Sequence, residues 1–279
     1  MILPGEKKKL RIVRILSQGA YLAEENGGTG GDEVLLPRKQ VPEGAAPGDE
    51  VEVFIYRDSG DRLISTTAEP LIRLHEVARL QVREVTKIGA FLDMGLERDL
   101  LLPFAGQTYE VKEGSYVLAA MYRDKSNRLA ATMKIYDYLS TASPYRAGDE
   151  VEGLVYEVSR NFGAFVAVDD KYSGLIPARE YEGEVKAGEF IRARVSAVKE
   201  DGKLDISVRK KAYLQLEDDG RTVLLYLNDN GGRIPFNDKA DPELIRETFH
   251  MSKAAFKRAV GHLLKAGRIK ITEDSILLL

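Results

Sequence analysis

Short runs of alternating apolar and polar residues recur along the first three quarters of this chain, and they predict β-strands. Within residues 148–210 the runs lie at 151–158, 164–168, 174–176, 191–198 and 204–208. Alternation with a period of two gives a strand one buried side and one side in water. Short strands in this number and order fit a partly open, five-stranded OB-type barrel.

One motif occurs three times in order along the chain. It consists of Gly-Ala-aromatic, then two apolar residues and a proline, then a glycine at a constant distance from that proline. The copies are Gly19-Ala20-Tyr21 with Pro37 and Gly48, Gly89-Ala90-Phe91 with Pro103 and Gly114, and Gly163-Ala164-Phe165 with Pro177 and Gly188. Self-similarity of this kind indicates a tandem array of one structural unit. We therefore expect three barrels, near residues 1–67, 75–135 and 148–210.

Two local features of the repeat have physical explanations. The glycine of Gly-Ala-aromatic follows a strand at a point where the chain must bend, and glycine tolerates a bulge there. The first copy carries extra residues around 27–31, a glycine-rich stretch that we interpret as a lengthened hairpin tip. It lacks the Lys-Ser/Thr that would follow in a phosphate-binding loop.

From about residue 214 the apolar residues follow helical spacing instead. Apolar residues at 222–227 precede a helix stop at 228–232. Asp241-Pro242 and Ser252 are good helix starts, and Gly267 is a good stop. Strands at 269–272 and 275–278 follow. The segment 217–220 is expected to be an acidic turn that ends a stiff connection over 209–216. The tail, 220–279, is thus predicted to be a winged helix, and the whole fold mostly β with a C-terminal α+β part.

The third copy resembles the S-one RNA-binding motif, a five-stranded OB barrel. The resemblance is carried by residues 161–168, 173–177 and 203–209. It implies that Phe162 and Phe165 stack on bases and that Lys203 and Arg209 hold phosphates. Where the family often has a histidine, this chain has Pro177. The first two copies lack the first aromatic, because Gln18 and Ile88 stand at that position, and we expect them to act mainly as packing or spacing units.

The tail extends the resemblance to the whole chain. Residues 238–243 and 249–261 are similar to the end of the CvfB family (conserved virulence factor B, YitL-like). Those proteins are bacterial RNA-binding regulators with S-one-like domains followed by a winged helix. Membership would imply a role in gene regulation, including virulence regulation.

Charge is distributed unevenly along the chain. Its 279 residues include 41 Lys and Arg against 44 Asp and Glu, for a net charge of −3, which disfavours strong non-specific binding to nucleic acid. Basic residues nevertheless gather at 192–211 and at 252–272. From these groups, and from the turn beside the aromatics, we select as RNA-binding residues Arg160, Arg192, Arg194, Lys253, Lys257 and Arg258. Lys253, Lys257 and Arg258 share one side of their helix, and we expect one RNA strand to contact both this side and the third barrel.

Other classes of function find less support. The chain has no cysteine, in keeping with a reducing cytoplasm, and no apolar stretch of membrane-spanning length. His75, His250 and His262 lie in no metal-binding spacing, so we expect neither an enzyme nor a metal or small-molecule cofactor. Two alternatives to single-stranded RNA binding stay open. The winged helix could read duplex DNA in a transcription regulator, or all units could form a protein-interaction scaffold.

Overall fold

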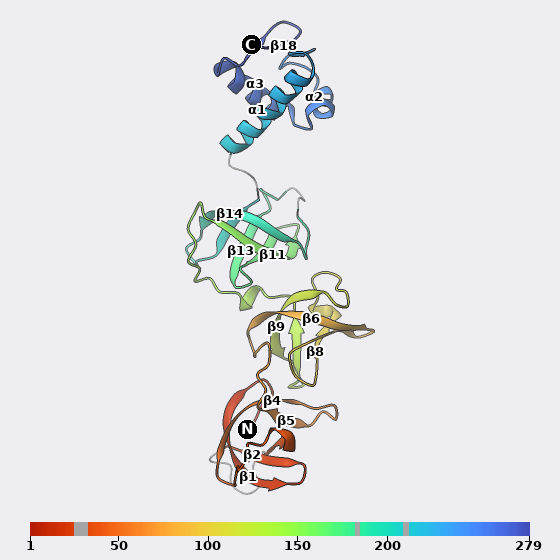
Figure 1. Ribbon diagram of the computed structural model, residues 1–279, viewed down its shortest axis with the longest axis vertical. Helices are drawn as coiled ribbons and strands as arrows, with labels where there is room; N and C mark the ends of the chain where they lie inside the picture. The colour runs from red at the N-terminus through yellow and green to blue at the C-terminus, as the bar shows by residue number, and fades with distance from the viewer. Residues whose placement is uncertain (25–32, 182–184, 209–211) are drawn as a thin grey trace. The chain divides into compact units, whose positions relative to one another are not determined.

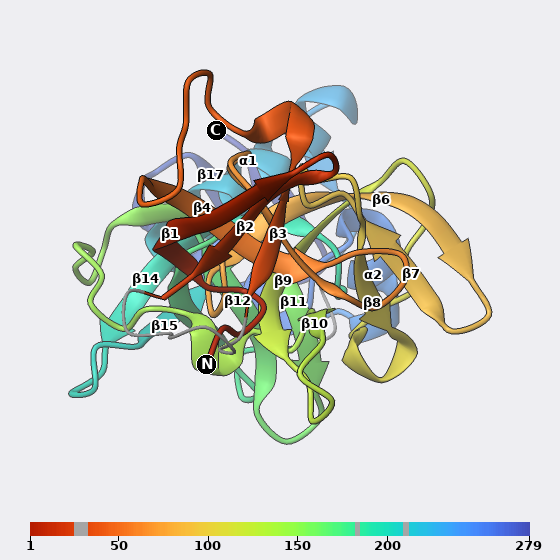
Figure 2. The same cartoon turned by 90° about the horizontal axis from the view of Figure 1, so that it is seen from below.

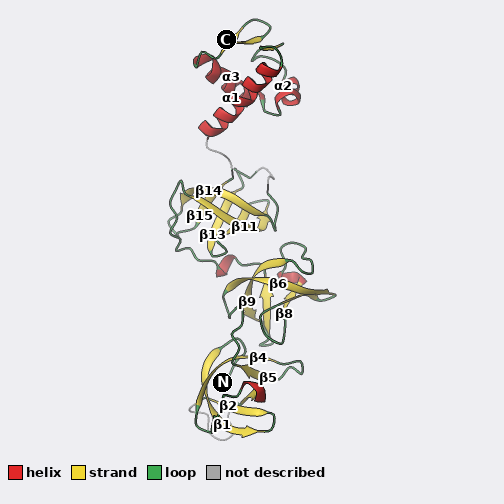
Figure 3. Cartoon of the chain, viewed as in Figure 1, coloured by secondary structure: helices red, strands yellow, loops and turns green. Residues whose placement is uncertain are grey.

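The computed structural model describes residues 1–24, 33–181, 185–208 and 212–279. Two compact units make up the chain, Met1–Val208 and Arg209–Leu279. Strands build the first unit, and the long helices lie in the second (Figures 1 and 3). The hairpin tip expected at 27–31 lies outside the described residues.

Within the described residues, the strands of the first unit form three closed five-stranded barrels. The first contains β1 (Lys7–Leu16), β2 (Gly19–Ala23), β3 (Val34–Pro37), β4 (Glu50–Arg57) and β5 (Leu63–Thr66), and Figure 2 shows β1 to β4 together. The second contains β6 (Val77–Thr86), β7 (Gly89–Leu92), β8 (Leu100–Pro103), β9 (Tyr116–Arg123) and β10 (Leu129–Thr132). The third contains β11 (Glu150–Ser159), β12 (Gly163–Val168), β13 (Tyr172–Pro177), β14 (Phe190–Val198) and β15 (Leu204–Ser207).

All three barrels have the same strand order. In the third it is β11-β12-β13-β15-β14, with β13 and β15 parallel and the other pairs antiparallel. We expected a partly open sheet, but the barrels are closed. They close because the long first strand pairs with two other strands. In the third barrel β11 pairs with β14 along its first half and with β12 along its second half. A bulge between Val155 and Glu157 bends the strand within its pairing with β12.

The repeated motif has a common structural role in the barrels. The motif glycine lies directly opposite the motif proline in each, as in the pair Gly163 and Pro177. At Gly163 the φ angle is +106° and a Cβ would lie 1.9 Å from the carbonyl oxygen of Ile176, so only glycine fits. The following alanine is fully buried in all three copies. The predicted barrel fold is therefore confirmed, and the motif marks the close approach of its second and third strands.

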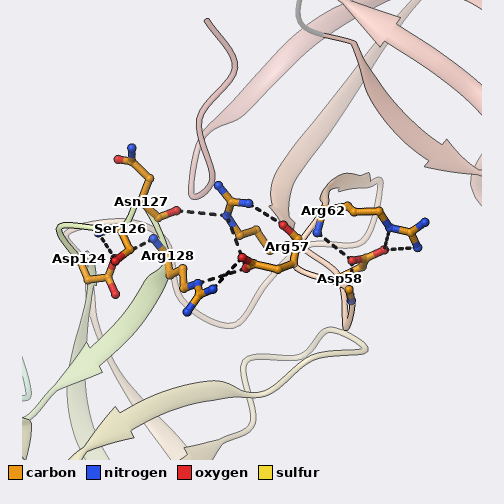
Figure 4. Close-up of polar contacts among 9 residues, drawn as sticks. Arg57, Asp58, Arg62, Asp124, Ser126, Asn127 and Arg128 are labelled. Atoms are coloured by element: carbon orange, nitrogen blue, oxygen red, sulfur yellow. Dashed lines mark hydrogen bonds and ion pairs between the residues drawn. The ribbon is translucent and has the colours of Figure 1, made fainter.

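Apolar contacts join the first barrel to the second. Phe54 and Tyr56 of β4 are buried in the same cluster as Leu80, Met121 and other core residues of the second barrel. Polar contacts border this junction, as Figure 4 shows around Arg57 and Arg128. The Arg128 guanidinium lies 2.7 Å from an Asp61 carboxylate oxygen, and Arg57 donates to the Asp61 carbonyl at 2.6 Å. Arg128 holds the pKa of the Asp61 carboxyl below its usual value by a hydrogen bond.

The second barrel is joined to the third in the same way. A buried cluster contains Leu118 and Ala120 of β9, Leu154 and Tyr156 of β11, and the linker residues Ile135 and Leu139. The linker includes a 3-10 turn, η3 (Tyr136–Tyr138). Phe165 of β12 packs at the edge of this cluster. Neighbouring barrels thus share apolar surface, as small cores of this size require.

The second unit is a winged helix, which confirms the prediction. It contains α1 (Ala212–Asp229), β16 (Arg233–Ile234), α2 (Pro242–Phe249), α3 (Lys253–Lys265), β17 (Ile269–Ile271) and β18 (Ile276–Leu278). The strands form a sheet in the order β16-β18-β17. Asp241 and Ser252 cap α2 and α3 by accepting hydrogen bonds from the backbone N–H groups of Glu243 and Ala255. Apolar residues of all three helices meet in one core with Ile269 and Ile276 of the wing.

One prediction about this unit is wrong. The segment 217–220 is not an acidic turn, because α1 runs through it from Ala212. Gly220 lies where α1 meets α3, and a Cβ there would be 3.6 Å from Leu263. This is an ordinary van der Waals distance, so the helix tolerates Gly220 without requiring it, and burial of Val223 and Leu227 stabilises the longer helix. The expected stiff connection begins with residues 209–211, which lie outside the described residues.

Candidate nucleic-acid interface

A hollow of about 550 Å³ opens on the outer face of the third barrel. Its volume lies in the range of small-molecule pockets. Aromatic, hydroxyl and charged side chains line it together. They are Tyr136, Glu157, Ser159, Phe162, Phe165, Ser173, Gly174, Leu175, Lys199 and Lys203.

A cross-strand row forms the floor of this hollow. Phe165 of β12 lies opposite Glu157 of β11 on one side and opposite Leu175 of β13 on the other. Residues directly opposite each other in antiparallel strands point to the same face. Because Ala164 and Val166, on either side of Phe165, point into the barrel core, the row points outward.

Three aromatic rings surround the hollow. Phe162, in the turn before β12, is 63% exposed, whereas Phe165 is half-buried. Their ring centroids are 6.3 Å apart and their planes are tilted by 56°. The ring of Tyr136, from the linker turn η3, meets Phe165 edge-on at 5.7 Å. Exposed aromatic faces of this kind are the platforms on which unpaired bases stack.

Two lysines border the rings. The Lys203 ammonium lies 2.7 Å from an Asp201 carboxylate oxygen and 5.3 Å from the centroid of the Tyr136 ring. The hydrogen bond to Asp201, then the one to Tyr136, raises the pKa of Lys203, so this group stays charged through the neutral range. Lys199 lies 3.1 Å from an Asp205 carboxylate oxygen. The hollow therefore combines stacking surface with positive charge, the two elements of a single-strand binding site.

The structure brings together only some of the residues selected from the sequence. Phe162, Phe165 and Lys203 line the hollow, and Arg160 is exposed in the turn just before Phe162. Arg192 instead forms an ion pair with Glu152 of β11 at 2.6 Å, and Arg194 of the same strand lies opposite Glu150. These two arginines line a part of the barrel that is rich in carboxylates. Arg209 lies outside the described residues.

Comparison with known proteins identifies each part of the chain. The S1 domain model matches residues 4–68 and 76–134, the model described as "Virulence regulatory factor CvfB, second domain" matches 137–210, and the CvfB-like winged helix domain matches 221–278. The uncharacterized protein YitL of Bacillus subtilis is 33% identical over 95% of this chain and 90% of its own. Conserved virulence factor B of Staphylococcus aureus is 30% identical over 90% of this chain and 87% of its own.

The chain belongs to the CvfB family. A solved multidomain protein with nucleic acid binding domains, from Streptococcus pneumoniae, aligns with 99% of this CvfB-family chain and 98% of its own at 26% identity, with a TM-score of 0.49. No helix among the described residues is both long and apolar enough to cross a membrane. Nor do the described His, Asp and Glu residues form a group that could hold a metal ion.

Sequence reasoning missed three of the aromatic and charged residues that line the hollow in this CvfB-family protein. Tyr136 lies in the linker, outside the repeated motif, so no sequence signal pointed to it. The repeat could have pointed to Glu157, because a charged residue lies opposite the motif aromatic in each barrel. That residue is Arg14 in the first barrel and Glu84 in the second. Lys199 was noted only as part of a basic stretch, because its approach to the aromatics depends on how the last two strands close the barrel.

The other two barrels present different surfaces at the equivalent position. In the first, the Arg14 guanidinium lies over the Tyr21 ring at 4.5 Å, and Gln18 donates to the Tyr21 hydroxyl at 2.8 Å. This ring is therefore already covered on one face. In the second, Ile88 is 60% exposed beside a half-buried Phe91. The aromatic pair of the third barrel has no counterpart in either.

The winged helix of this CvfB-family chain carries its basic residues on α3. Lys257 and Arg258 are exposed. Lys253 is half-buried, and its ammonium donates a hydrogen bond to the Lys239 carbonyl oxygen at 3.1 Å. Phe256 and Val260 of the same helix are buried in the core. Lys257 and Arg258 are thus available for phosphate contacts, while Lys253 also holds the chain before α2.

Proposed function

We propose that this protein binds single-stranded RNA and acts as a post-transcriptional regulator of gene expression in the bacterial cytoplasm. The observation that supports this most directly is the hollow of the third barrel, where three aromatic rings lie beside two lysines. Aromatic platforms bind bases of any sequence, and lysines neutralise the adjoining phosphates. The absence of cysteine is in keeping with a reducing compartment.

In this proposal Phe162 and Phe165 are the stacking residues and Lys203 is a phosphate ligand. Arg160, next to Phe162 in the turn, and Arg209 would extend the phosphate contacts. Arg192 and Arg194 take a secondary place, because neither lines the hollow. Lys253, Lys257 and Arg258 of the winged helix would form a second, basic contact.

Stacking requires unpaired bases, so the strand form of the nucleic acid is the first property to test. Binding should be measured with single-stranded RNA, duplex RNA and duplex DNA side by side, over a series of salt concentrations. We expect the tightest binding to single-stranded RNA, because the stacked bases of a duplex cannot reach the rings. The slope of log affinity against log salt reports the number of phosphate contacts.

Two results would contradict the proposal in different ways. Equal or tighter binding to duplex DNA at the same salt would favour a DNA-reading winged helix. A DNA-reading helix usually exposes Arg, Asn or Gln to the edges of the bases. Of the two exposed cations of α3, Lys257 and Arg258, only Arg258 is of this kind, which argues against that alternative. Failure to bind any of the three nucleic acids would favour a protein-interaction scaffold.

A further inference from the structure

Glu157 differs from the other charged residues of the hollow. Lys199 and Lys203 are paired with the carboxylates of Asp205 and Asp201. Among the described residues, no hydrogen bond or ion pair engages the Glu157 side chain, although it is half-buried. A carboxylate can only accept hydrogen bonds, and a partly buried one gains from N–H donors that replace lost water.

The position of Glu157 places this acceptor beside the stacking surface. It follows the bulge of β11 and lies directly opposite Phe165 in the strand register. Both side chains line the hollow. A base that stacks on Phe165 would therefore present one of its edges to the Glu157 carboxylate.

The four RNA bases differ in what they offer to a carboxylate. Guanine has two adjacent donors on its Watson–Crick edge, N1–H and the N2 amino group, which match the two carboxylate oxygens. Its neighbouring O6 is an acceptor that suits a lysine ammonium. Adenine and cytosine present one amino group beside a ring nitrogen that accepts, and uracil presents one N–H between two carbonyls. Those acceptors would be turned toward a negative charge.

We propose that the hollow of the third barrel selects an unpaired guanine, and that Glu157 is the residue that reads its Watson–Crick edge. Lys199 and Lys203, which line the same hollow, supply donors for O6. This inference rests on the proposed function, because it concerns the same site and requires that single-stranded RNA bind there. It adds a base preference to a surface whose stacking alone is tolerant of sequence.

The test uses the full chain and short single-stranded oligouridylates that differ only at one central position. That position is guanine, inosine, adenine, cytosine or uracil. We expect the guanine oligonucleotide to bind at least about fivefold more tightly than the uracil one, the lower limit for a bidentate base contact. Inosine keeps N1–H and O6 but lacks the N2 amino group, so it should bind more weakly than guanine.

The variant Glu157→Gln should remove this discrimination. Its side-chain amide offers one acceptor in place of two, so the affinities for guanine and inosine should become equal within about twofold. The readout is the ratio of guanine affinity to inosine affinity. Loss of a negative charge raises the affinity for every oligonucleotide, and this common increase cancels in the ratio. Glu84→Gln is the matched control, because Glu84 lies opposite Phe91 in the same register position of the second barrel. That variant should keep the guanine preference of the natural chain.

The outcomes separate this inference from the function on which it rests. Equal affinity of the natural chain for the guanine and uracil oligonucleotides would overturn the base preference while leaving RNA binding intact. An unchanged ratio of guanine to inosine affinity in Glu157→Gln would overturn the role of Glu157. Absence of binding to every oligonucleotide would overturn the proposed function and the inference together. Equal melting temperatures of the natural chain and both variants would confirm that folding is not the cause.

Discussion

At the scale of single residues, the two phenylalanines of the third barrel have different surroundings. Phe162 is 63% exposed in a turn, and the nearest ring to it is that of Phe165. Phe165 is half-buried and also meets the rings of Tyr136 and Tyr156. A substitution of Phe162 therefore tests stacking alone, whereas a substitution of Phe165 changes packing between barrels as well.

We predict that Phe162→Ala weakens binding to single-stranded RNA by about 1–3 kcal/mol, the usual value of one base stacked on an aromatic ring. Its melting temperature should stay near that of the natural chain, because little buried surface is lost. Phe165→Ala should weaken binding by a similar amount and also lower the melting temperature. Affinity and thermal unfolding measured on the same samples separate the two effects. Unchanged RNA affinity in Phe162→Ala would contradict the stacking role.

Lys203 permits a second prediction at this scale. If it contacts a phosphate, Lys203→Ala should reduce the slope of log affinity against log salt by about one, because one fewer counterion is released. Phe162→Ala should leave that slope unchanged, which makes it the control. A slope that does not change in Lys203→Ala would contradict a phosphate contact by this lysine.

At the scale of secondary-structure elements, one glycine in a strand and one in a helix have opposite effects on stability. Gly163 begins β12 at a positive φ, where a Cβ would collide with the carbonyl oxygen of Ile176. Gly261 lies inside α3, is exposed, and has no atom within 4 Å of the place that a Cβ would take. Only the first of these glycines is required by the backbone.

We predict that Gly261→Ala stabilises the winged helix by about 0.5–1 kcal/mol, the helix propensity difference between the two residues. Gly163→Ala should destabilise the third barrel by at least about 1–3 kcal/mol, because it adds backbone strain to a steric clash. Denaturant unfolding of the two variants measures both values. A stable Gly163→Ala protein would mean that the second and third strands can move apart, and would contradict the explanation given for the motif.

At the scale of the whole molecule, buried apolar contacts link neighbouring barrels of the first unit. Phe54 of β4 is 2% exposed and belongs to the cluster that contains the core of the second barrel. The ion pair between Asp61 and Arg128 spans the same junction but is exposed on both sides. Burial of apolar surface outweighs an exposed ion pair in free energy.

We therefore predict that Phe54→Ala lowers the free energy of unfolding by about 3–5 kcal/mol. Asp61→Ala should lower it much less, because both partners of the Asp61–Arg128 ion pair are exposed to solvent. Denaturant titration of the Met1–Leu279 chain measures both. If the two substitutions had equal effects, the junction would be held by its charges and the argument from burial would be wrong.

The winged helix gives the last prediction, which depends on the length of the RNA. Two binding units in one chain gain effective concentration only on a strand long enough to reach both. Changing Lys253, Lys257 and Arg258 together to alanine should weaken binding to a long single strand more than to a short one. A variant with only Lys257 and Arg258 changed keeps the Lys253 hydrogen bond to Lys239 and controls for folding. Equal losses for both lengths would refute a contribution from this helix to a shared strand.

The sequence by itself determined the division of this chain into repeated barrels and a winged helix. Alternating apolar residues define strands wherever one side is buried, and the motif glycine is imposed by a backbone contact that recurs in each copy. The helix caps at Asp241 and Ser252 could be predicted because each depends only on residues two or three positions along the chain. The segment 217–220 was misread because a glycine inside a helix and a glycine at a helix end look alike in sequence.

Only the tertiary structure decided which side chains share the hollow of the third barrel. Strand register placed Glu157 beside Phe165, and the linker between barrels brought in Tyr136. The register of β14 against β11 placed Arg192 away from the aromatics and paired it with Glu152. Such neighbours come from distant parts of the chain, and their contacts depend on how strands close a barrel and how barrels pack. Local patterns of hydrophobicity carry no information about either.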